Sequence, residues 1–423
     1  MNESFLHYVW RHRLFNPSNL QTTDGEKISI IHPGFAHQHA GPDFKQSVVK
    51  INDIMWAGDV EIHVKSSDWL KHHHQNDPKY NSVILHVVYE HDVELYKEEK
   101  RSFPTFVLGA HIPETLIRRY MELSTSKEEL VCRRHIQELN PLTMTSFLSR
   151  VAIERLLSRQ HHIFEVVSQC EDNWEEAFFR ILAISFGFKT NEGAFDLLGR
   201  SIPFHYLSKH LTARTQIYAL IFGQAGMLEE PCEDDYYLQL SSEYQYLRYK
   251  YKLTPIPKSC WNYLRLRPKN FPCIRLAEFS ELLFRAPKLF NNLLEGISTQ
   301  ELLKVLSVTP DAYWQTHYHF GKCVKSSNLS VGKAAAFSII INTLVPILFS
   351  YSVFHGDETM QNRAVSVLES VEFEENSITR IYREIGFPTG SALDSQAILQ
   401  LKREYCSKKQ CLKCSIGSFI LRR

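Results

Sequence analysis

The sequence predicts an α+β protein, in which a mixed β-sheet flanked by helices near the N-terminus precedes a large all-helical region. Two observations lead to this class. Up to about residue 110, short apolar runs of strand length alternate with turn residues. From about residue 141 onward, apolar residues recur three and four positions apart, as on one face of a helix. We therefore expect two domains, residues 1–125 and residues 126–423.

The N-terminal elements follow from local patterns. Residues 2–15 are expected to form a helix, since Phe5, Tyr8 and Val9 fall at helical spacing. Five strands are expected after it, at residues 27–31, 47–51, 54–64, 82–89 and 103–108. Asn52-Asp53 is a plausible tight turn between the second and third strands, because both residues tolerate positive φ. A short helix is expected to open near Ser67 or Asp68, which are good N-cap residues.

Composition limits the functional classes. Lys and Arg total 48 against 47 for Asp and Glu, so the net charge is +1 and no global basic field for nucleic acid exists. The first residues, MNESFLHYVWRHRLF, carry charges inside an amphipathic pattern and do not read as a signal peptide. The nine cysteines are an odd number and mostly scattered, which is typical of reduced thiols. We expect a cytoplasmic protein.

One apolar segment raises the question of a membrane. Residues 334–354 contain no charged residue and are long enough to span a bilayer. The segment nevertheless includes Asn342, Thr343 and Pro346, and no second candidate accompanies it. A buried helix of the C-terminal domain is the preferred interpretation and a membrane span is the alternative.

Ionisable residues gather on one expected strand. In GDVEIHVK, side chains alternate between the two faces, so Asp59, Glu61, His63 and Lys65 share a face. An ordinary solvated strand face would have the same pattern. Asp43 favours a functional site over an ordinary solvated face. It opens the preceding strand after a Gly-Pro turn, and a hairpin can bring it beside Glu61.

Paired carboxylates of this kind suit a hard divalent cation. Asp43 and Glu61 would bind Mg²⁺ or Mn²⁺, which lowers the pKa of bound water and stabilises charge on a phosphate. His63 or Lys65 would then orient the attacking water or hold the phosphate. His86, within the apolar strand 82–89, is expected to lie beside this face.

The order of these elements resembles the PD-(D/E)XK nuclease superfamily. The expected order is helix, three strands, helix and strand, with Pro42-Asp43 at the second strand and Glu61-Ile62-His63 on the third. The resemblance implies a restriction-endonuclease-like sheet and metal-dependent cleavage of DNA or RNA. His63 stands where the superfamily has lysine, and Lys65 lies two residues further on. The string GPDF…GDVEIH…W…H…LHVV also resembles an uncharacterised bacterial family found mostly in Bacteroidetes. This resemblance covers most of the chain and implies no activity.

Histidines suggest a second kind of site. His37 and His39 with Asp43 resemble the HxH-plus-acid pattern of cupins, which bind Fe, Mn or Zn in a jelly roll. About five strands are too few for that architecture. The run from His72 to His74 is interpreted as a polar helix face.

Three cysteines lie close together near the C-terminus, in YCSKKQCLKC. The spacing of Cys406, Cys411 and Cys414 is typical of Zn or Fe–S sites. Cys132 is the first candidate for a fourth ligand, and Cys323 or a histidine is the alternative. A reduced thiol cluster without metal, or a redox pair, is the alternative.

Three functions therefore remain open. The first is a metal-dependent nuclease, a hydrolase that cleaves phosphodiester bonds with a metal-activated water. The second is a catalytically inactive nucleic-acid-binding or scaffold protein on the same core, which the missing lysine favours. The third is a histidine-rich, cupin-like metalloenzyme. DNA or RNA is the expected partner, no membrane is expected, and the sequence indicates no small-molecule ligand.

Overall fold

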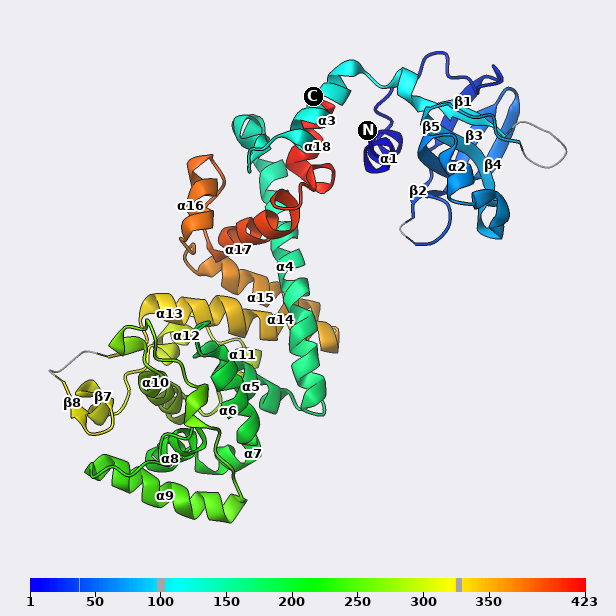
Figure 1. Cartoon of the computed structure of the whole chain (residues 1–423). Coiled ribbons are helices and arrows are strands. Elements are labelled where there is room, and N and C mark those ends of the chain that lie inside the picture. The colour runs from blue at the N-terminus through cyan, green and yellow to red at the C-terminus, as the bar shows by residue number, and fades with distance from the viewer. Residues whose placement is uncertain (38, 97–102, 325–328) are drawn as a thin grey trace. The chain divides into compact units, whose positions relative to one another are not determined.

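The computed structural model describes residues 1–37, 39–96, 103–324 and 329–423. The chain folds into two compact units, shown in Figure 1. Unit 1 comprises residues 1–147 together with the C-terminal residues 401–423, and unit 2 comprises residues 148–400. The α+β class is confirmed. Unit 1 extends beyond the predicted limit at residue 125 and includes the C-terminal segment, which the predicted division had assigned to the helical domain.

A mixed sheet forms the body of unit 1. Its strands are β1 (Ile28–His32), β2 (Phe35–Ala36), β3 (Phe44–Ile51), β4 (Ile54–Lys65), β5 (Val83–Glu90) and β6 (Thr105–Val107). The order is β1-β3-β4-β5-β6, with β2 paired to β3. The first three strands of this order are antiparallel, whereas β5 and β6 run parallel to β4. The five predicted strands are therefore confirmed, and the two-residue β2 was missed. This single sheet with parallel pairs does not fit the antiparallel jelly roll of the cupin-like alternative.

Helices complete unit 1. They are α1 (Glu3–Arg11), α2 (Asp68–Lys71), α3 (Glu114–Thr125) and α18 (Ser415–Arg422), with short helical turns η1 (His74–Asn76), η2 (Pro78–Tyr80), η4 (Leu108–His111) and η5 (Val131–Glu138). The N-cap Asn2 accepts the Phe5 N–H, and one face of α1 is buried against β4 and α3. Phe5 stacks on Tyr120 of α3 with ring centroids 4.1 Å apart. Figure 1 shows the C-terminal α18 beside α3.

Unit 2 is built almost entirely from helices. They are α5 (Trp174–Ser185), α6 (Glu192–Ser201), α7 (Phe204–Leu207), α8 (Arg214–Gln224), α9 (Asp235–Tyr251), α10 (Pro272–Arg285), α11 (Leu289–Glu295), α12 (Thr299–Leu306), α13 (Lys333–Ile339), α14 (Val345–His355), α15 (Glu358–Ser370), α16 (Ser377–Glu384) and α17 (Ala392–Gln400). The long helix α4 (Pro141–Gln169) begins in unit 1 and continues into unit 2. A two-stranded ribbon, β7 (His317–His319) and β8 (Lys322–Cys323), interrupts the helices.

The apolar segment weighed as a membrane span lies in unit 2. Helices α13 and α14, joined by a π-helical turn, form one helix from Lys333 to His355 that is long and apolar enough to cross a bilayer. Most of it is buried among the other helices of the unit. This burial agrees with the predicted core helix, and length and composition alone are weak grounds for a membrane span.

A β-bulge in the β3–β4 hairpin places Asp43 on the same face of the sheet as Glu61. The register shifts between Ser47 and Phe44, because β3 has one residue more than β4 in this stretch. Beyond the shift Phe44 lies opposite Val60, so Asp43 comes opposite Glu61. Residues opposite each other on antiparallel strands share a face. Without the extra residue, Asp43 would lie on the other face.

Gln46 is the bulged residue with unusual backbone geometry. Its φ is +57°, in the left-handed region that L-residues other than Asn and Gly seldom adopt. The Asp59 carboxylate supports the bulge by accepting the Gln46 N–H at 3.1 Å and the Ser82 hydroxyl at 2.7 Å. The bulge is thus held from β4 and from the segment that leads into β5.

Substitutions at Gln46 test this geometry. Gln46→Gly should stabilise the hairpin because glycine adopts positive φ without strain, whereas Gln46→Val should destabilise it by about 1–2 kcal/mol. Hydrogen exchange of peptides covering residues 44–62 is the measurement. Lys50→Val, at an ordinary position of the same strand, is the matched control and should leave exchange nearly unchanged. Equal exchange in the Gly and Val variants would contradict the assigned bulge.

Candidate functional site

Asp43 and Glu61 lie together, as the sequence predicted. The Asp43 N–H donates to Glu61 Oε2 at 3.0 Å, and the Ile62 N–H donates to Asp43 Oδ2 at 3.0 Å. The Glu61 side chain is 6% exposed and that of Asp43 is 23% exposed. Burial, followed by the charge of Asp43, raises the pKa of Glu61 to about 9, although the Asp43 N–H opposes the rise. Glu61 is therefore a neutral acid near pH 7 when nothing else binds to it.

Three imidazoles cluster beside the Glu61 carboxyl group, and two of them, those of His63 and His74, face it. Ring nitrogens of His63, His72 and His74 lie within 4.8 Å of one another. Glu61 Oε1 is 3.3 Å from His74 Nε2 and 3.5 Å from His63 Nε2. His72 Nδ1 lies 3.2 Å from His63 Nε2. One carboxyl group and three imidazoles thus converge on one small volume.

The turn after α2 brings two of these histidines to the site. Helix α2 ends at Lys71, and His73 adopts a left-handed conformation with φ +61°. This reversal lets His72 and His74, on either side of His73, both reach His63. The His74 ring stacks on Tyr80 with centroids 3.8 Å apart. The interpretation of this run as a polar helix face was wrong, because the helix stops before it.

His86 supports His63 from the neighbouring strand. His86 Nε2 lies 2.9 Å from His63 Nδ1, and both rings are buried. Burial, with a smaller contribution from neighbouring histidines, lowers the pKa of His63 to about 2 and that of His86 to about 3. Both imidazoles are therefore neutral. If the His63 Nδ1–H donates to His86, the lone pair on His63 Nε2 faces Glu61 and His72, as a metal ligand requires.

Helix α1 contributes two residues that sequence reasoning missed. His7 Nε2 lies 3.2 Å from Asp43 Oδ2, and Glu3 is one turn earlier on the same helix. Burial lowers the pKa of His7, but the hydrogen bond and charge of Asp43 outweigh it and raise that pKa overall. Burial and the charge of Asp43 raise the pKa of Glu3. Glu3 and His7 are spaced i, i+4 beside an apolar helix face, and this spacing could have indicated that both lie near the site.

Other predicted residues lie further from the carboxylates. Lys65 is 3.4 Å from Glu90 and substantially exposed, so its charge is directed to that carboxylate. His37 and His39 are neighbours, with ring centroids 5.6 Å apart, and the His37 N–H donates to the Asp43 carbonyl at 2.7 Å. They border the start of β3 and are not among the clustered imidazoles.

The donor set fits a first-row transition metal. Imidazole nitrogen suits Zn²⁺ and Fe²⁺, whereas carboxylate oxygen suits Mn²⁺ and Mg²⁺, and Mg²⁺ also retains water. The set was expected to contain carboxylates alone, and the structure adds nitrogen donors to them. The mixed set therefore fits Zn²⁺ or Fe²⁺ through its imidazoles and the expected Mn²⁺ through its carboxylates.

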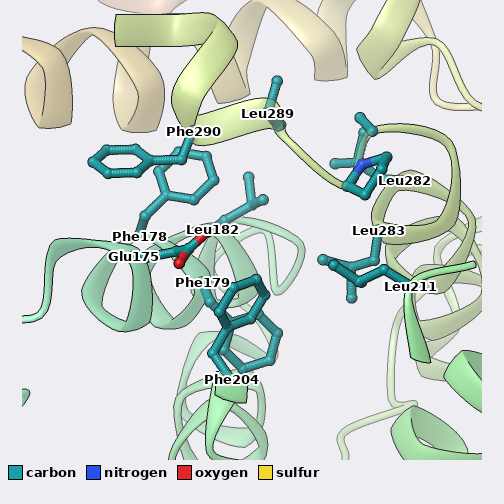
Figure 2. Close-up of a pocket in the computed structure, with 12 residues that line it drawn as sticks. Glu175, Phe178, Phe179, Leu182, Phe204, Leu211, Leu282, Leu283, Leu289 and Phe290 are labelled. Carbon is teal, nitrogen blue, oxygen red and sulfur yellow. The ribbon is translucent and has the colours of Figure 1, made fainter. Parts of the chain in front are cut away.

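Unit 2 contains an apolar pocket between α5, α7, α10 and α11 (Figure 2). Phe178, Phe179, Phe204 and Phe290 supply aromatic walls, and leucines supply much of the remainder. Glu175 is the one ionisable side chain among the lining residues. Such a lining offers apolar contact and no convergent catalytic groups.

The fold and the site define an α+β protein with a partly buried histidine–carboxylate cluster beside its N-terminal sheet. A family model described as "Protein of unknown function (DUF2851)" matches residues 3–377. The chain belongs to this family, so the expected resemblance to an uncharacterised family is confirmed. Searches of curated proteins and of solved structures gave no match.

The raised pKa of Glu61 predicts a pH dependence for metal-free protein. Between its ordinary value of 4.5 and about 9, folded Glu61 holds a proton that unfolded Glu61 has lost. The free energy of unfolding should therefore fall as pH rises through this window, by up to about 1.4 kcal/mol per pH unit. Urea unfolding in EDTA from pH 7 to 8 measures the effect, since unfolded histidines are then mostly neutral and cysteines are mostly protonated in both states.

Glu61→Gln should reduce this alkaline decline, because glutamine does not ionise, and His7, whose pKa is also raised, should keep its own part of it. Glu122→Gln, an exposed position on α3, is the matched control and should keep the decline. A wild-type slope that Glu61→Gln leaves intact would contradict the assignment of the proton to Glu61.

Proposed function

We propose that unit 1 is a metal-dependent phosphodiesterase, with DNA or RNA as substrate. The observation that carries this proposal is the cluster of His63, His72 and His74, two of which face Glu61 beside Asp43. Polar groups concentrated in a buried place cost stability, and such clusters are typical of functional sites.

The element order agrees with the nuclease proposal. Helix α1 is followed by the antiparallel strands β1, β3 and β4, and α2 then leads to β5, which is parallel to β4. This is the element order of the resemblance to PD-(D/E)XK nucleases. Asp43 stands immediately before β3 and Glu61 on β4, at the positions where that resemblance has its acids.

A bound divalent metal would lower the pKa of a water molecule and stabilise charge on the phosphate. The residues of this chain would hold the metal through Glu61 and the three imidazoles, with Asp43 at the more exposed side. In hydrolysis the water would lose a proton to solvent, its oxygen would bond to phosphorus, and a phosphorus–oxygen ester bond would break. His7, which is paired with Asp43 and one-third exposed, would donate the proton that the leaving oxygen requires.

Two lysines are placed to contact the substrate backbone. A side chain at Gly41 would lie 3.8 Å from Lys45 Nζ and 4.0 Å from Lys79 Cβ, so both residues border the segment that leads to Asp43. Positive charge there would attract a phosphate backbone locally, although the net charge of the chain is only +1.

Cleavage assays test the activity. Full-length protein with Mn²⁺ should cleave single- or double-stranded DNA or RNA, and Asp43→Ala and Glu61→Ala should each lower the rate at least about 100-fold, as loss of a key electrostatic group does. Glu122→Ala is the control and should keep full activity. Wild-type cleavage no greater than that of the Asp43 and Glu61 variants, over several substrates and with Mg²⁺, Mn²⁺ and Zn²⁺, would overturn the proposal.

A catalytically inactive nucleic-acid-binding protein is the second candidate. The observation that favours it is the absence of a cation where the resemblance has lysine, since His63 is buried and neutral and Lys65 is directed to Glu90. Metal binding separates the two candidates. An inactive scaffold should bind Mn²⁺ no better than Asp43→Ala does, while Lys45→Ala should still weaken binding to nucleic acid several-fold.

Calorimetry with Mn²⁺ and fluorescence anisotropy with a labelled oligonucleotide make these measurements. Tight Mn²⁺ binding that is lost in Asp43→Ala would contradict the scaffold candidate. Unchanged oligonucleotide affinity in Lys45→Ala would contradict the assigned substrate contact. Lys50→Ala, on the same strand beyond the bulge, is the matched control for charge.

A further inference from the structure

The C-terminal segment of the chain folds back onto the stretch around residue 132. Lys409 Nζ donates to the carbonyl oxygens of Ser126 at 3.2 Å and Glu128 at 2.6 Å. Arg423 forms an ion pair with Glu138 at the other end of the same stretch. Cys132 lies between these two attachments, on η5, and α18 packs against η5.

This arrangement brings four cysteines into one region of unit 1. Cys406 ends a π-helical turn (Leu401–Cys406), Cys411 begins a 3₁₀ turn (Cys411–Lys413), and Cys414 is the N-cap of α18. The Cys414 N–H donates to the Cys411 carbonyl at 3.2 Å, which closes the loop between them. The thiols are near enough to influence one another. Burial first, and then Cys406, Cys414 and Cys411, raise the pKa of Cys132 to about 12.

A glycine fixes the loop between Cys411 and Cys414. A Cβ atom at Gly417 would lie 2.1 Å from the Cys411 carbonyl oxygen, so only glycine allows the first turn of α18 to approach so closely. The peptide N–H groups of Gly417 and Ile416 favour the charged form of the Cys414 sulfur, because they lower its pKa against the effect of burial. Compact Cys-x2-Cys loops of this kind are typical of thiolate metal sites.

The surroundings suit thiolates that are neutralised by a metal. Basic side chains at Arg133, Arg134, Lys409 and Lys413 surround the cysteines in sequence and would offset the excess negative charge of four thiolates around a divalent ion. The segment between Lys402 and Lys413 has few apolar residues, so a metal would give it a core.

We propose that Cys132, Cys406, Cys411 and Cys414 bind a thiophilic metal centre that cross-links the C-terminal segment to η5. The ligand chemistry is four thiolates, which both a zinc ion and an iron–sulfur cluster accept. The centre is structural, because its ligands lie on the two separate chain segments of unit 1, residues 1–147 and 401–423, and would hold these segments together. It is separate from the histidine–carboxylate site of the sheet.

Metal content and ligand identity of the wild-type protein test this proposal without any variant. Full-length protein, purified anaerobically and without a metal-chelating tag, should contain one zinc, or iron with an equal amount of acid-labile sulfide. X-ray absorption should show four sulfur neighbours at about 2.3 Å from the metal. Metal-free protein in which all four thiols react freely, or a metal with nitrogen and oxygen neighbours alone, would overturn the proposal.

Variants then assign the ligands. Cys411→Ser and Cys132→Ser should each lose this metal, whereas Cys323→Ser, at an exposed cysteine on β8, should keep it. His74→Ala should also keep the sulfur-coordinated metal, which separates this centre from the sheet site whether or not the latter binds metal. Full retention of the metal in folded Cys411→Ser or Cys132→Ser protein would overturn the ligand assignment.

Discussion

The candidate site of the sheet depends on one extra residue in β3. Side chains in a strand alternate between faces, so a shift of one residue moves every following side chain to the opposite face. The bulge at Gln46 makes this shift just before Asp43 and places its carboxylate on the face of Glu61. The Asp59 carboxylate holds the bulge, and its own N–H donates to the Ser82 carbonyl at 2.9 Å. Two acids of one strand therefore have different tasks: Asp59 supports the backbone and Glu61 faces the imidazoles.

The polar cluster is better explained by function than by stability. Glu61, His63 and His86 are each no more than 5% exposed, and apolar residues of similar volume would be less costly there. Their hydrogen bonds are mainly to one another, so the cluster is satisfied only as a whole. His86 Nδ1 lacks a partner among the described residues, which adds to the cost. A bound cation would offset much of this cost, because it stabilises ionised Glu61 and the lone pairs of neutral imidazoles together.

The strands and helices of unit 1 could largely be predicted from the sequence, whereas the residues of the site could be predicted only in part. Apolar alternation identified the five main strands, and the spacing on β4 placed Glu61 and His63 on one face. That Asp43 shares this face rests on the bulge, which has no sequence signature, since glutamine at positive φ is unusual. His72 and His74 were misread because the end of α2 at Lys71 depends on tertiary packing. The discontinuous unit 1 was missed for a related reason: helical periodicity alone does not show that residues 401–423 pack against η5.

The two proposed centres would select different metals by their donors. The sheet site offers imidazole nitrogen and carboxylate oxygen, a set that suits borderline and hard cations, whereas the cysteine site offers sulfur alone. Soft thiolates favour zinc or iron–sulfur chemistry and discriminate strongly against Mn²⁺ and Mg²⁺. A cation that exchanges during turnover at Glu61 would thus have little affinity for the thiolates. One unit can therefore keep a permanent structural metal and an exchangeable catalytic one, because ligand softness, and not distance, separates them.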